Sequence, residues 1–238
     1  MGYVHKMRED ETRPVHRRTP VVDSGLVIDP QMGELAVAFE KTITADSLAR
    51  LSVDLGVPVE TLHSLRVGWD AKSGAYSFPM RAAGNLVVGI RLRKPDGAKF
   101  SIPNSRNGLF IPRRVSPGGI LYVVEDASDT AAMVAMGFAV VGRPSNTAGR
   151  ELICEFYKRF LPRRDVVIIR NADPVGSVAE HHTIAGAESL AESLVSSKAC
   201  SSISIVYPPV KDVRAWFNQG CTRHDVESLS SSDAGCLK

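Results

Sequence analysis

Residues 120–146 read ILYVVEDASDTAAMVAMGFAVVGRPSN, and this stretch decides the fold. The apolar run over 120–124 is typical of a buried parallel strand. A helical pattern over 128–136 follows and ends at a glycine, and a second apolar run over 138–141 predicts another strand. A strand–helix–strand unit of this minimal length predicts two parallel strands with a right-handed connection. We therefore expect an α/β fold built around a parallel sheet.

Acidic residues stand at the carboxyl ends of two predicted strands. Glu125 follows the first strand, and Asn171 and Asp173 follow another apolar run over 165–170. Ligands of parallel sheets lie beyond the carboxyl ends of the strands, so these side chains converge if the strands are neighbours. Mg²⁺ suits such a site, because it binds a few protein oxygens and leaves its other coordination positions to water and phosphate. Acids after strands also cap helices and turns, and the residues alone leave both interpretations open.

A family resemblance supports the first interpretation. Glu125, Asp129 and Gly137 resemble the E-G-x-x-D…G signature of the Toprim domain, which primases, topoisomerases and related nucleases share. Residues 171–173 stand where that family has D-x-D, and the resemblance spans residues 118–207. It implies a Toprim-like parallel sheet flanked by helices.

The resemblance also implies roles for individual side chains. Glu125 and Asp173 would be catalytic, and Glu125, Asn171 and Asp173 would hold Mg²⁺ or Mn²⁺. Asp129 is a secondary position of the motif, as is Asp126, which replaces the usual glycine. Asn171 replaces the first Asp of D-x-D and brings an amide oxygen without a negative charge. Because charge count tunes such sites, we expect a lower metal affinity than the family pattern gives.

The segment over 75–114 is basic and strand-like. Apolar runs over 86–93 and 99–102, separated by Asp96-Gly97, predict an antiparallel hairpin, and 108–111 predicts a further strand. The segment carries eight basic residues against the single acid Asp96: Arg81, Arg91, Arg93, Lys94, Lys99, Arg106, Arg113 and Arg114. A basic face beside an acidic edge suits the handling of phosphate groups, and a solvated strand face is the alternative.

This segment also resembles the part of bacterial DNA primases that precedes their Toprim domain. The residues in matching order are Phe78-Pro-Met-Arg81, Gly84, Gly89, Arg93, Lys99, Asn104-Ser105 and Leu109-Phe110. The resemblance implies Mg²⁺-dependent nucleotidyl transfer in DNA replication, with single-stranded DNA or a primer–template, nucleotides and a replicative helicase as partners. The expected nucleic-acid or phosphate contacts are Arg81, Arg91, Arg93, Lys99 and Arg143. Such primases carry a zinc module ahead of this region, and we expect no zinc site in this chain.

The patterns divide the chain into five segments. We expect a flexible N-terminal tail over 1–30, a helical lead-in over 31–70, a primase-like basic β region over 71–115, a Toprim-like α/β domain over 116–209, and C-terminal helices and a tail over 210–238.

Two local predictions concern helices. Short helices over 44–56 and 58–65 are compatible with a helix-turn-helix, but no basic recognition face is visible, so we expect them to pack as a small cap. A helix over 183–196 leaves 173–182 as a loop over the acidic edge. Histidines 181 and 182 in that loop are within reach of a phosphate or metal, although a plain surface position is the simpler interpretation.

Composition narrows the class of protein. The 238 residues are 44% hydrophobic and 23% charged, with a net charge of +3, so the total charge indicates no partner. The four cysteines are scattered without a C-x-x-C pair and indicate neither a zinc site nor a disulfide framework. No apolar run reaches the length of a membrane span and no signal peptide opens the chain, so we expect a cytoplasmic protein without a membrane partner.

Two alternatives to a primase-like enzyme stay open. A catalytically weakened nucleic-acid-binding module, working with a helicase or polymerase, would explain the departures at Asp126 and Asn171. A Toprim-type nuclease would share the fold. DNA binding that is sensitive to salt but independent of metal would identify the binding module. A cut product would identify the nuclease.

Overall fold

The structure is a computed structural model of the chain, and it describes residues 4–6, 29–116, 119–161, 164–197 and 200–232. Of the predicted N-terminal tail, residues 1–3 and 7–28 lie outside the described residues, as do residues 233–238 of the predicted C-terminal tail. No described helix is long and apolar enough to cross a membrane.

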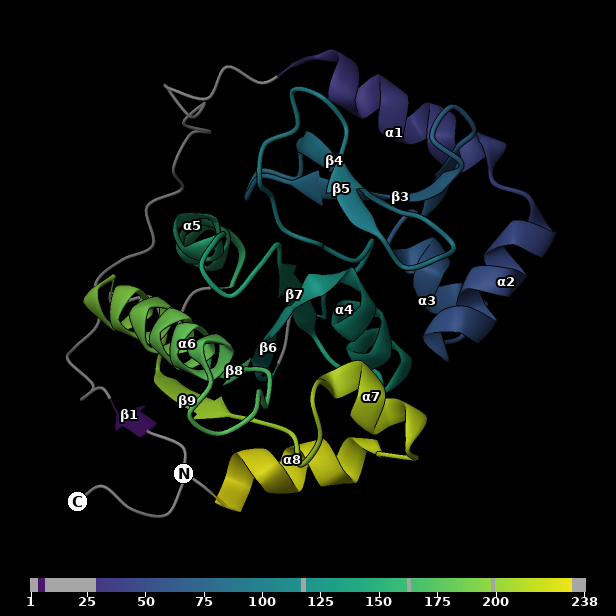
Figure 1. The fold of residues 1–238 in the computed structure, drawn as a ribbon. Helices are drawn as coiled ribbons and strands as arrows, with labels where there is room; N and C mark the ends of the chain where they lie inside the picture. The colour runs from purple at the N-terminus through teal and green to yellow at the C-terminus, as the bar shows by residue number, and fades with distance from the viewer. Residues whose placement is uncertain (1–3, 7–28, 117–118, 162–163, 198–199, 233–238) are drawn as a thin grey trace.

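A five-stranded sheet forms the centre of the molecule (Figure 1). Its parallel strands are β6 (Leu121–Glu125), β7 (Val140–Arg143), β8 (Val166–Ile169) and β9 (Ser202–Val206), and the strand order is β1-β9-β8-β6-β7. Strand β1 (Val4–Lys6) pairs antiparallel with β9 at the edge, so this part of the predicted tail is a strand. The parallel α/β architecture expected from the sequence is confirmed.

Helices cover both faces of this sheet. Helices α4 (Asp126–Ala135), α7 (Val213–Asn218) and α8 (Arg223–Ser232) lie on one face, and α5 (Arg150–Phe160) and α6 (Val178–Ser196) lie on the other (Figure 1). Each face has its own apolar cluster. Burial on both faces explains why the strands are continuous apolar runs rather than alternating ones.

Strand β6 shows how one run serves both clusters. Its side chains alternate between the faces, so Leu121 and Val123 pack in the cluster with α5 and α6. Tyr122 and Val124 pack in the cluster with α4. All four are 2% exposed or less, and the next residue, Glu125, is the first that reaches the carboxyl edge.

A second sheet is antiparallel, as the sequence predicts. It consists of β2 (Gly68–Asp70), β3 (Ala75–Arg81), β4 (Val87–Arg93) and β5 (Lys99–Ser101) in that order. Helix α1 (Gln31–Thr42) packs on one side of it through a small apolar cluster. The strand β2 lies inside the segment expected to be helical, because this backbone pairs with β3 and continues the sheet.

Two short helices connect α1 to this sheet. Helix α2 (Ala45–Leu55) begins at Thr44, whose side chain accepts from the Ser47 N–H, and it ends at Gly56 in the left-handed conformation. Helix α3 (Val59–Ser64) follows a proline, as predicted. Both helices bury their leucines in the cluster that contains α4, so they pack as a cap.

The predicted strand over 108–111 does not form as a regular strand. Instead, Leu109 makes a single bridge to Arg81 of β3, and Phe110 makes a single bridge to Gly142 of β7. These residues are therefore the backbone link between the two sheets. Their neighbours on the two sides belong to different sheets, so no continuous ladder can form.

The start of α6 also differs from the sequence prediction. The helix begins at Val178 rather than near 183, because Ser177 and Glu180 form a capping box. The Ser177 hydroxyl accepts from the Glu180 N–H at 3.0 Å, and the Glu180 carboxylate accepts from the Gly176 N–H at 2.6 Å. His181 and His182 are consequently exposed helical residues and not part of a loop.

The link at Gly142 leads to a stability prediction. A Cβ there would lie 2.1 Å from Thr130 Oγ1 and 3.0 Å from the Asp126 carbonyl oxygen. We expect Gly142→Ala to destabilise the fold by about 1–3 kcal/mol, because the start of α4 must move. Gly33→Ala is the matched control, since nothing lies within 4 Å of its Cβ and α1 should gain about 0.5–1 kcal/mol. Urea unfolding of both variants checks the opposite signs, and equal effects would contradict the packing argument.

Candidate active site

The acidic residues predicted from the sequence converge at the carboxyl edge of the parallel sheet. Glu125 ends β6, Asp173 follows β8, and these two strands pair directly. Burial raises the pKa of the Glu125 carboxyl, and the carboxylates of Asp126 and Asp173 raise it further, against the opposing effects of Arg143 and the Asn146 N–H. The two residues therefore stand at the same edge of the sheet.

A short chain of hydrogen bonds orients Asp173. The Thr183 hydroxyl of α6 donates to Asp173 Oδ2 at 2.7 Å, and Asn146 Nδ2 donates to Thr183 Oγ1 at 3.2 Å. The backbone before Asp173 is held as well, because the Ala172 N–H donates to the Lys211 carbonyl at 2.8 Å. Sequence reasoning missed Asn146 and Thr183, since neither belongs to the family motif and both act through contacts distant along the chain.

Asn171 stands at the edge between these groups with an uncommitted side chain. Its backbone carbonyl accepts from Arg170 Nη1 at 3.0 Å, and the Arg170 guanidinium lies 4.3 Å from the centre of the Tyr207 ring. Its side-chain amide makes no hydrogen bond to a described residue. The amide oxygen is therefore available to a ligand at this edge.

Arg143 lies beside Glu125 but is buried at 2% exposure. Its Nη1 donates to the carbonyl of Asn146 at 3.0 Å and to the carbonyl of Gly186 at 3.2 Å, and its buried Nε has no hydrogen-bond partner among the described residues. Burial lowers its pKa, and Glu125 raises it. The arginine predicted to bind phosphate thus holds the loop after β7 against α6.

The backbone conformation at Asp126 accounts for the glycine that the Toprim signature has at this position. Its φ is +69°, a left-handed conformation that side chains other than Asn and Asp rarely adopt. Its carboxylate forms an ion pair with Lys99 of β5 and accepts from the Ser128 N–H at 3.3 Å. Burial opposes ionisation, but Lys99 and the N–H donors of Ala127 and Ser128 outweigh it and lower the pKa of Asp126.

Asp129 lies one helical turn behind the edge and is 4% exposed. Its Oδ1 accepts from the Arg214 N–H at 3.1 Å. Burial raises its pKa well above the ordinary value, and the nearby carboxylate of Asp212 raises it further. Asp212 itself caps α7 by accepting from the Ala215 N–H at 2.7 Å. Asp129 therefore joins α4 to α7 beneath the edge.

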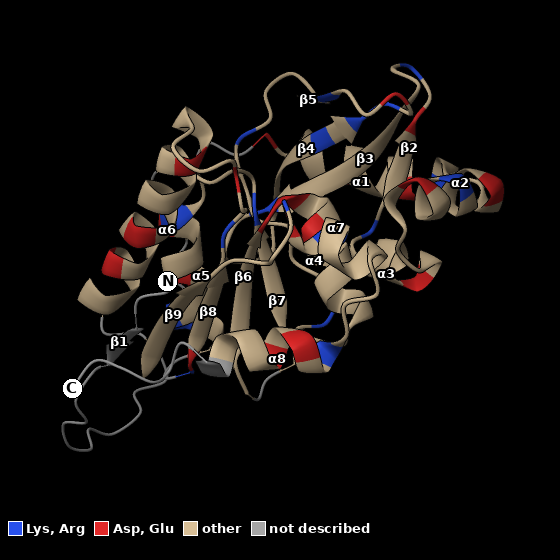
Figure 2. Cartoon of the chain, turned by 60° about the horizontal axis from the view of Figure 1, so that its bottom comes forward, with Lys and Arg blue, Asp and Glu red and all other residues tan. Residues whose placement is uncertain are grey.

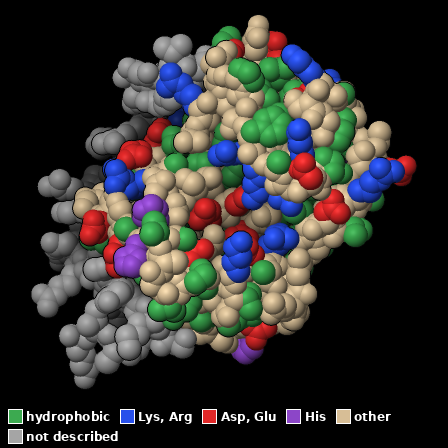
Figure 3. All heavy atoms as spheres, viewed as in Figure 1, with side chains coloured by type: hydrophobic (Ala, Val, Ile, Leu, Met, Phe, Trp, Pro, Cys, Tyr) green, Lys and Arg blue, Asp and Glu red, His purple; other side chains and the backbone are tan. Residues whose placement is uncertain are grey.

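Three of the predicted basic residues lie on one face of the antiparallel sheet. Arg93 pairs with Lys99 across β4 and β5, and Arg91 pairs with Ser101, so these side chains share one face of the antiparallel sheet. Lys99 extends from that face to Asp126. Figure 2 shows basic and acidic residues together between the two sheets, and Figure 3 shows them near the centre of one surface. Lys99 thus contacts the candidate site, and Arg91 and Arg93 lie on the same face of the antiparallel sheet as Lys99.

Arg81 is not part of this group. The pairing of β3 with β4 shifts register between Met80 and Arg81, and Arg81 is 7% exposed. Its Nη1 donates to the Asn85 carbonyl at 2.9 Å. We therefore separate Arg81 from the basic face formed by the other three residues.

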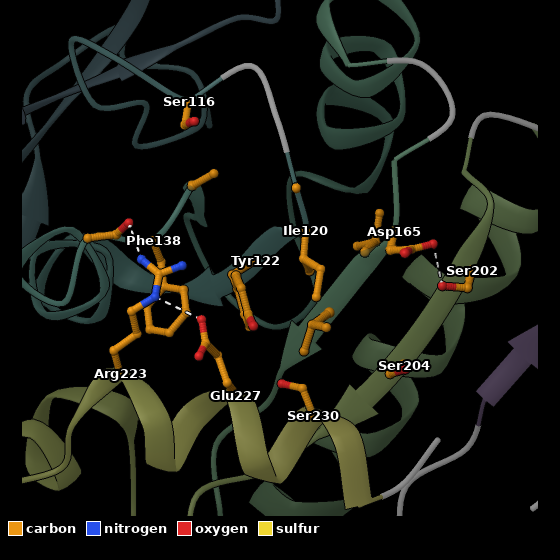
Figure 4. A pocket seen from close by; sticks show the side chains of 15 residues that line it. Ser116, Ile120, Tyr122, Phe138, Asp165, Ser202, Ser204, Arg223, Glu227 and Ser230 are labelled. Carbon is orange, nitrogen blue, oxygen red and sulfur yellow. Dashed lines mark hydrogen bonds and ion pairs between the residues drawn. The ribbon is translucent and has the colours of Figure 1, made fainter. Parts of the chain in front are cut away.

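A cavity of 660 Å³ lies elsewhere in the molecule (Figure 4). Its lining includes Ile120, Asp165 and Ser202, which stand at the amino ends of β6, β8 and β9, and Arg223 and Glu227 of α8. Ligands of parallel sheets lie at the opposite, carboxyl edge. This cavity therefore does not contribute to the candidate site.

The donors at the carboxyl edge fit a hard divalent cation. Glu125 and Asp173 offer carboxylates and Asn171 an amide oxygen, and Mg²⁺ prefers a few such oxygens with the remaining positions open to water and phosphate. Burial, and then the carboxylates of Asp126 and Asp173, raise the pKa of Glu125, and a bound cation would offset the cost of holding this negative charge. Among the described residues, no group of three or more His, Cys, Asp or Glu side chains is placed to hold a metal ion.

Asp129 gives a prediction about pH and stability. Its folded-state pKa lies above the unfolded value of about 3.9, so its contribution to stability decreases as the pH rises from that value through the folded-state pKa. Asp129→Asn keeps the acceptor for Arg214 without the charge. We expect its melting temperature to exceed that of the wild type by roughly 3 °C or more at neutral pH and the difference to vanish near about pH 4.

Thermal unfolding across pH in the presence of a chelator measures this difference. Glu188→Gln, at an exposed position of α6, is the control for loss of one negative charge and should not show the pH-dependent gain. A lower melting temperature for Asp129→Asn at neutral pH would show that the carboxylate is needed in its charged form.

Comparison with known proteins identifies the architecture. No family model matches the sequence, and no curated protein matches it. Solved primase structures do match in fold. The primase fragment of the bacteriophage T7 primase-helicase protein aligns with a TM-score of 0.56 and 15% identity, over 74% of this chain and 72% of that chain.

Two further structures give the same result. The zinc-binding and RNA polymerase domains of the Aquifex aeolicus primase align with a TM-score of 0.63 and 12% identity, over 84% of this chain and 59% of that chain. A DnaG primase catalytic domain bound to single-stranded DNA aligns with a TM-score of 0.62 and 12% identity, over 84% and 79%. The Toprim-like unit and the basic sheet predicted from the sequence therefore form the fold of a DnaG-type primase catalytic core.

Proposed function

We propose that this chain is a primase-like nucleotidyltransferase that acts on nucleic acid in DNA replication. One observation carries the proposal: the Lys99–Asp126 ion pair joins the basic face of the antiparallel sheet to the acidic edge of the parallel sheet. Cations for a polyanionic strand and oxygen ligands for a metal thus meet at one place. The likeness in fold to primase catalytic cores supports this assignment.

Glu125, Asn171 and Asp173 would hold Mg²⁺ or Mn²⁺. Such an ion, when bound, neutralises charge that develops on a reacting phosphoryl group. The hydrogen bonds from Thr183 to Asp173 and from Asn146 to Thr183 fix the direction of one ligand before any ion arrives. Orientation of ligands by such partners is a general feature of metal sites in proteins.

The protein's own groups supply the other functions. Arg91, Arg93 and Lys99 would bind the phosphates of a template or nucleotide on the face from which Lys99 contacts Asp126. Glu125 would act as a ligand of the ion or, when not bound to it, as the proton acceptor for an attacking hydroxyl, and its raised pKa in the metal-free protein suits the second role. The buried Arg143 would keep the loop after β7 in place beside Glu125.

The expected partners follow from this assignment. One structural neighbour is a DnaG catalytic domain bound to single-stranded DNA, and another is the primase fragment of a primase-helicase protein. We propose single-stranded DNA or a primer–template and nucleotides as ligands of this chain, and a replicative helicase as its protein partner. The basic face of Arg91, Arg93 and Lys99 would contact the single-stranded DNA or primer–template.

A nucleic-acid-binding module without catalysis is the second candidate. The uncharged Asn171 favours it, because the edge then has two carboxylates, Glu125 and Asp173, beside a third, Asp126, that is already paired with Lys99. Such a module would bind DNA through the same basic face and work with another polymerase or a helicase. The two candidates differ in their need for a metal: the nucleotidyltransferase requires one for synthesis, and the binding module binds DNA without one.

Magnesium titration by calorimetry in the presence of single-stranded DNA tests the metal site. We expect the wild type to bind Mg²⁺, Asp173→Ala to abolish binding, and Asn171→Asp to strengthen it by roughly tenfold, because one charged ligand is added. No binding by the wild type, with binding restored by Asn171→Asp, would instead indicate the non-catalytic module.

Primer synthesis assays then test the reaction itself. Glu125→Gln keeps the size of the side chain and should reduce metal-dependent synthesis by at least ~10²-fold, which is the usual contribution of a general base or ligand. Glu188→Gln on the exposed side of α6 should retain activity. Unchanged synthesis by Glu125→Gln would contradict the proposed site, and a cut product would indicate a nuclease.

The basic face gives a separate prediction. Lys99→Ala should weaken the binding of single-stranded DNA by roughly tenfold and reduce its salt dependence, since one phosphate contact is lost. Asp126→Gly removes the carboxylate that pairs with Lys99 and relieves the left-handed strain, so it should strengthen DNA binding without loss of stability. Fluorescence anisotropy at several salt concentrations measures both, and weaker binding by Asp126→Gly would contradict the competition between Asp126 and phosphate.

A further inference from the structure

A pocket of 300 Å³ lies where the antiparallel sheet approaches α5. Three guanidinium groups line it, from Arg66, Arg81 and Arg113. The side formed by α5 carries two aromatic rings, Phe156 and Phe160. No residue of the acidic edge is among the described residues that line this pocket. It is therefore a second site of concentrated positive charge.

Arg81 is the most buried of the three arginines. Only 7% of it is exposed, and its Nη1 donates to the Asn85 carbonyl at 2.9 Å. Its Nε and Nη2 donate to no acceptor among the described residues. Burial lowers its pKa to about 10, with further lowering by Arg66 and Arg113 against the opposing effect of Glu40. With a pKa of about 10 the guanidinium keeps its charge at neutral pH, and an anion nearby would offset the cost of burying it.

The charges around Arg81 are not balanced within the described part of the chain. Arg66 has no side-chain partner there, and Arg113 pairs with Glu40 and donates through Nε to the His63 carbonyl at 3.1 Å. Three guanidinium groups therefore face one carboxylate, which leaves an excess of two positive charges. The Arg113–Glu40 pair is partly exposed to solvent, so it can be exchanged for another anion at little cost.

The aromatic side of the pocket indicates what the anion is attached to. Phe160 is 48% exposed, although it stands next to the pocket and 5.3 Å from the Phe156 ring. An exposed ring beside cations is the arrangement that single-strand binders use, in which bases stack on aromatic side chains and phosphates bind basic residues. An inorganic anion would make no use of the ring.

We propose that this pocket binds a phosphate group of a nucleotide unit, with the adjacent base against Phe160. The proposal rests on the proposed nucleic-acid function and extends it by a second contact point. Val87 pairs with Arg81 and Arg93 pairs with Lys99, so the two contact points lie at opposite ends of β4, ~20 Å apart. A strand of a few nucleotides spans that distance, and a free nucleoside triphosphate offers the same chemistry.

Arg66→Asn is the most informative variant. Arg66 has a φ of +56°, and Asn is among the residues that best tolerate this left-handed conformation, so the backbone is preserved. We expect single strands of ~4 to ~16 nucleotides to bind the variant about tenfold more weakly, with a smaller salt dependence. Phe160→Leu keeps an apolar side chain but loses the ring, and it should weaken binding by about fivefold or more.

Glu40→Gln provides a test in the opposite direction. It removes the carboxylate that competes for Arg113, so it should strengthen binding severalfold, which a merely damaged structure would not do. Arg50→Gln, at an exposed position of α2, removes the same charge as Arg66→Asn and should leave binding unchanged. Fluorescence anisotropy with labelled strands in a chelator, and calorimetry with ATP, measure the two sources of the nucleotide unit separately.

The outcomes separate this proposal from the proposed function. Weaker binding of either the strands or ATP by Arg66→Asn and Phe160→Leu supports the pocket and identifies its ligand, even if no primer synthesis is found. Wild-type affinity for both ligands in Arg66→Asn and Phe160→Leu overturns the pocket. If Lys99→Ala still weakens strand binding in that case, the proposed nucleic-acid face stands without it.

Discussion

The backbone bridge between Phe110 and Gly142 is the constraint on which the site depends. The two residues exchange hydrogen bonds of 2.9 Å and 3.0 Å and so attach the antiparallel strands to the outer edge of β7. Because Gly142 has no side chain, the start of α4 can lie against the same strand. That close approach sets the position of Asp126 relative to Lys99, and hence of the acidic edge relative to the basic face.

The two departures from the Toprim signature have related consequences for charge. Asn171 removes a carboxylate from the edge, and Asp126 adds one in its place, at a backbone position of φ +69° where glycine is the unstrained residue. The formal number of carboxylates is therefore preserved. Their distribution is not, because Asp126 is paired with Lys99 and raises the pKa of Glu125 more than Asp173 does. Asp126, which departs from the motif, thus adds to the effect of burial on the pKa of Glu125.

How much the sequence predicts depends on the range of the interactions involved. Strand periodicity and the rule for parallel sheets place Glu125 and Asp173 at one edge, and the alternation of β4 places Arg91 and Arg93 on one face. The burial of Arg143 could not be predicted, because its acceptors are the carbonyls of a loop and of α6 that meet only in the folded chain. The start of α6 at Val178 was readable from the spacing of Ser177 and Glu180, which is that of a capping box.

The ion pair between Lys99 and Asp126 also determines how the site can accept a ligand. Both side chains are partly exposed, so solvent screens their attraction and the pair contributes little to stability. A nucleic-acid phosphate carries one negative charge, as a carboxylate does, and its non-bridging oxygens are acceptors for Lys99, so it can replace Asp126 at small cost. The released carboxylate then lies next to Glu125, where it increases the negative charge available to a divalent cation. Binding of a nucleic-acid phosphate and binding of a metal would therefore favour one another, through a residue that the family motif does not contain.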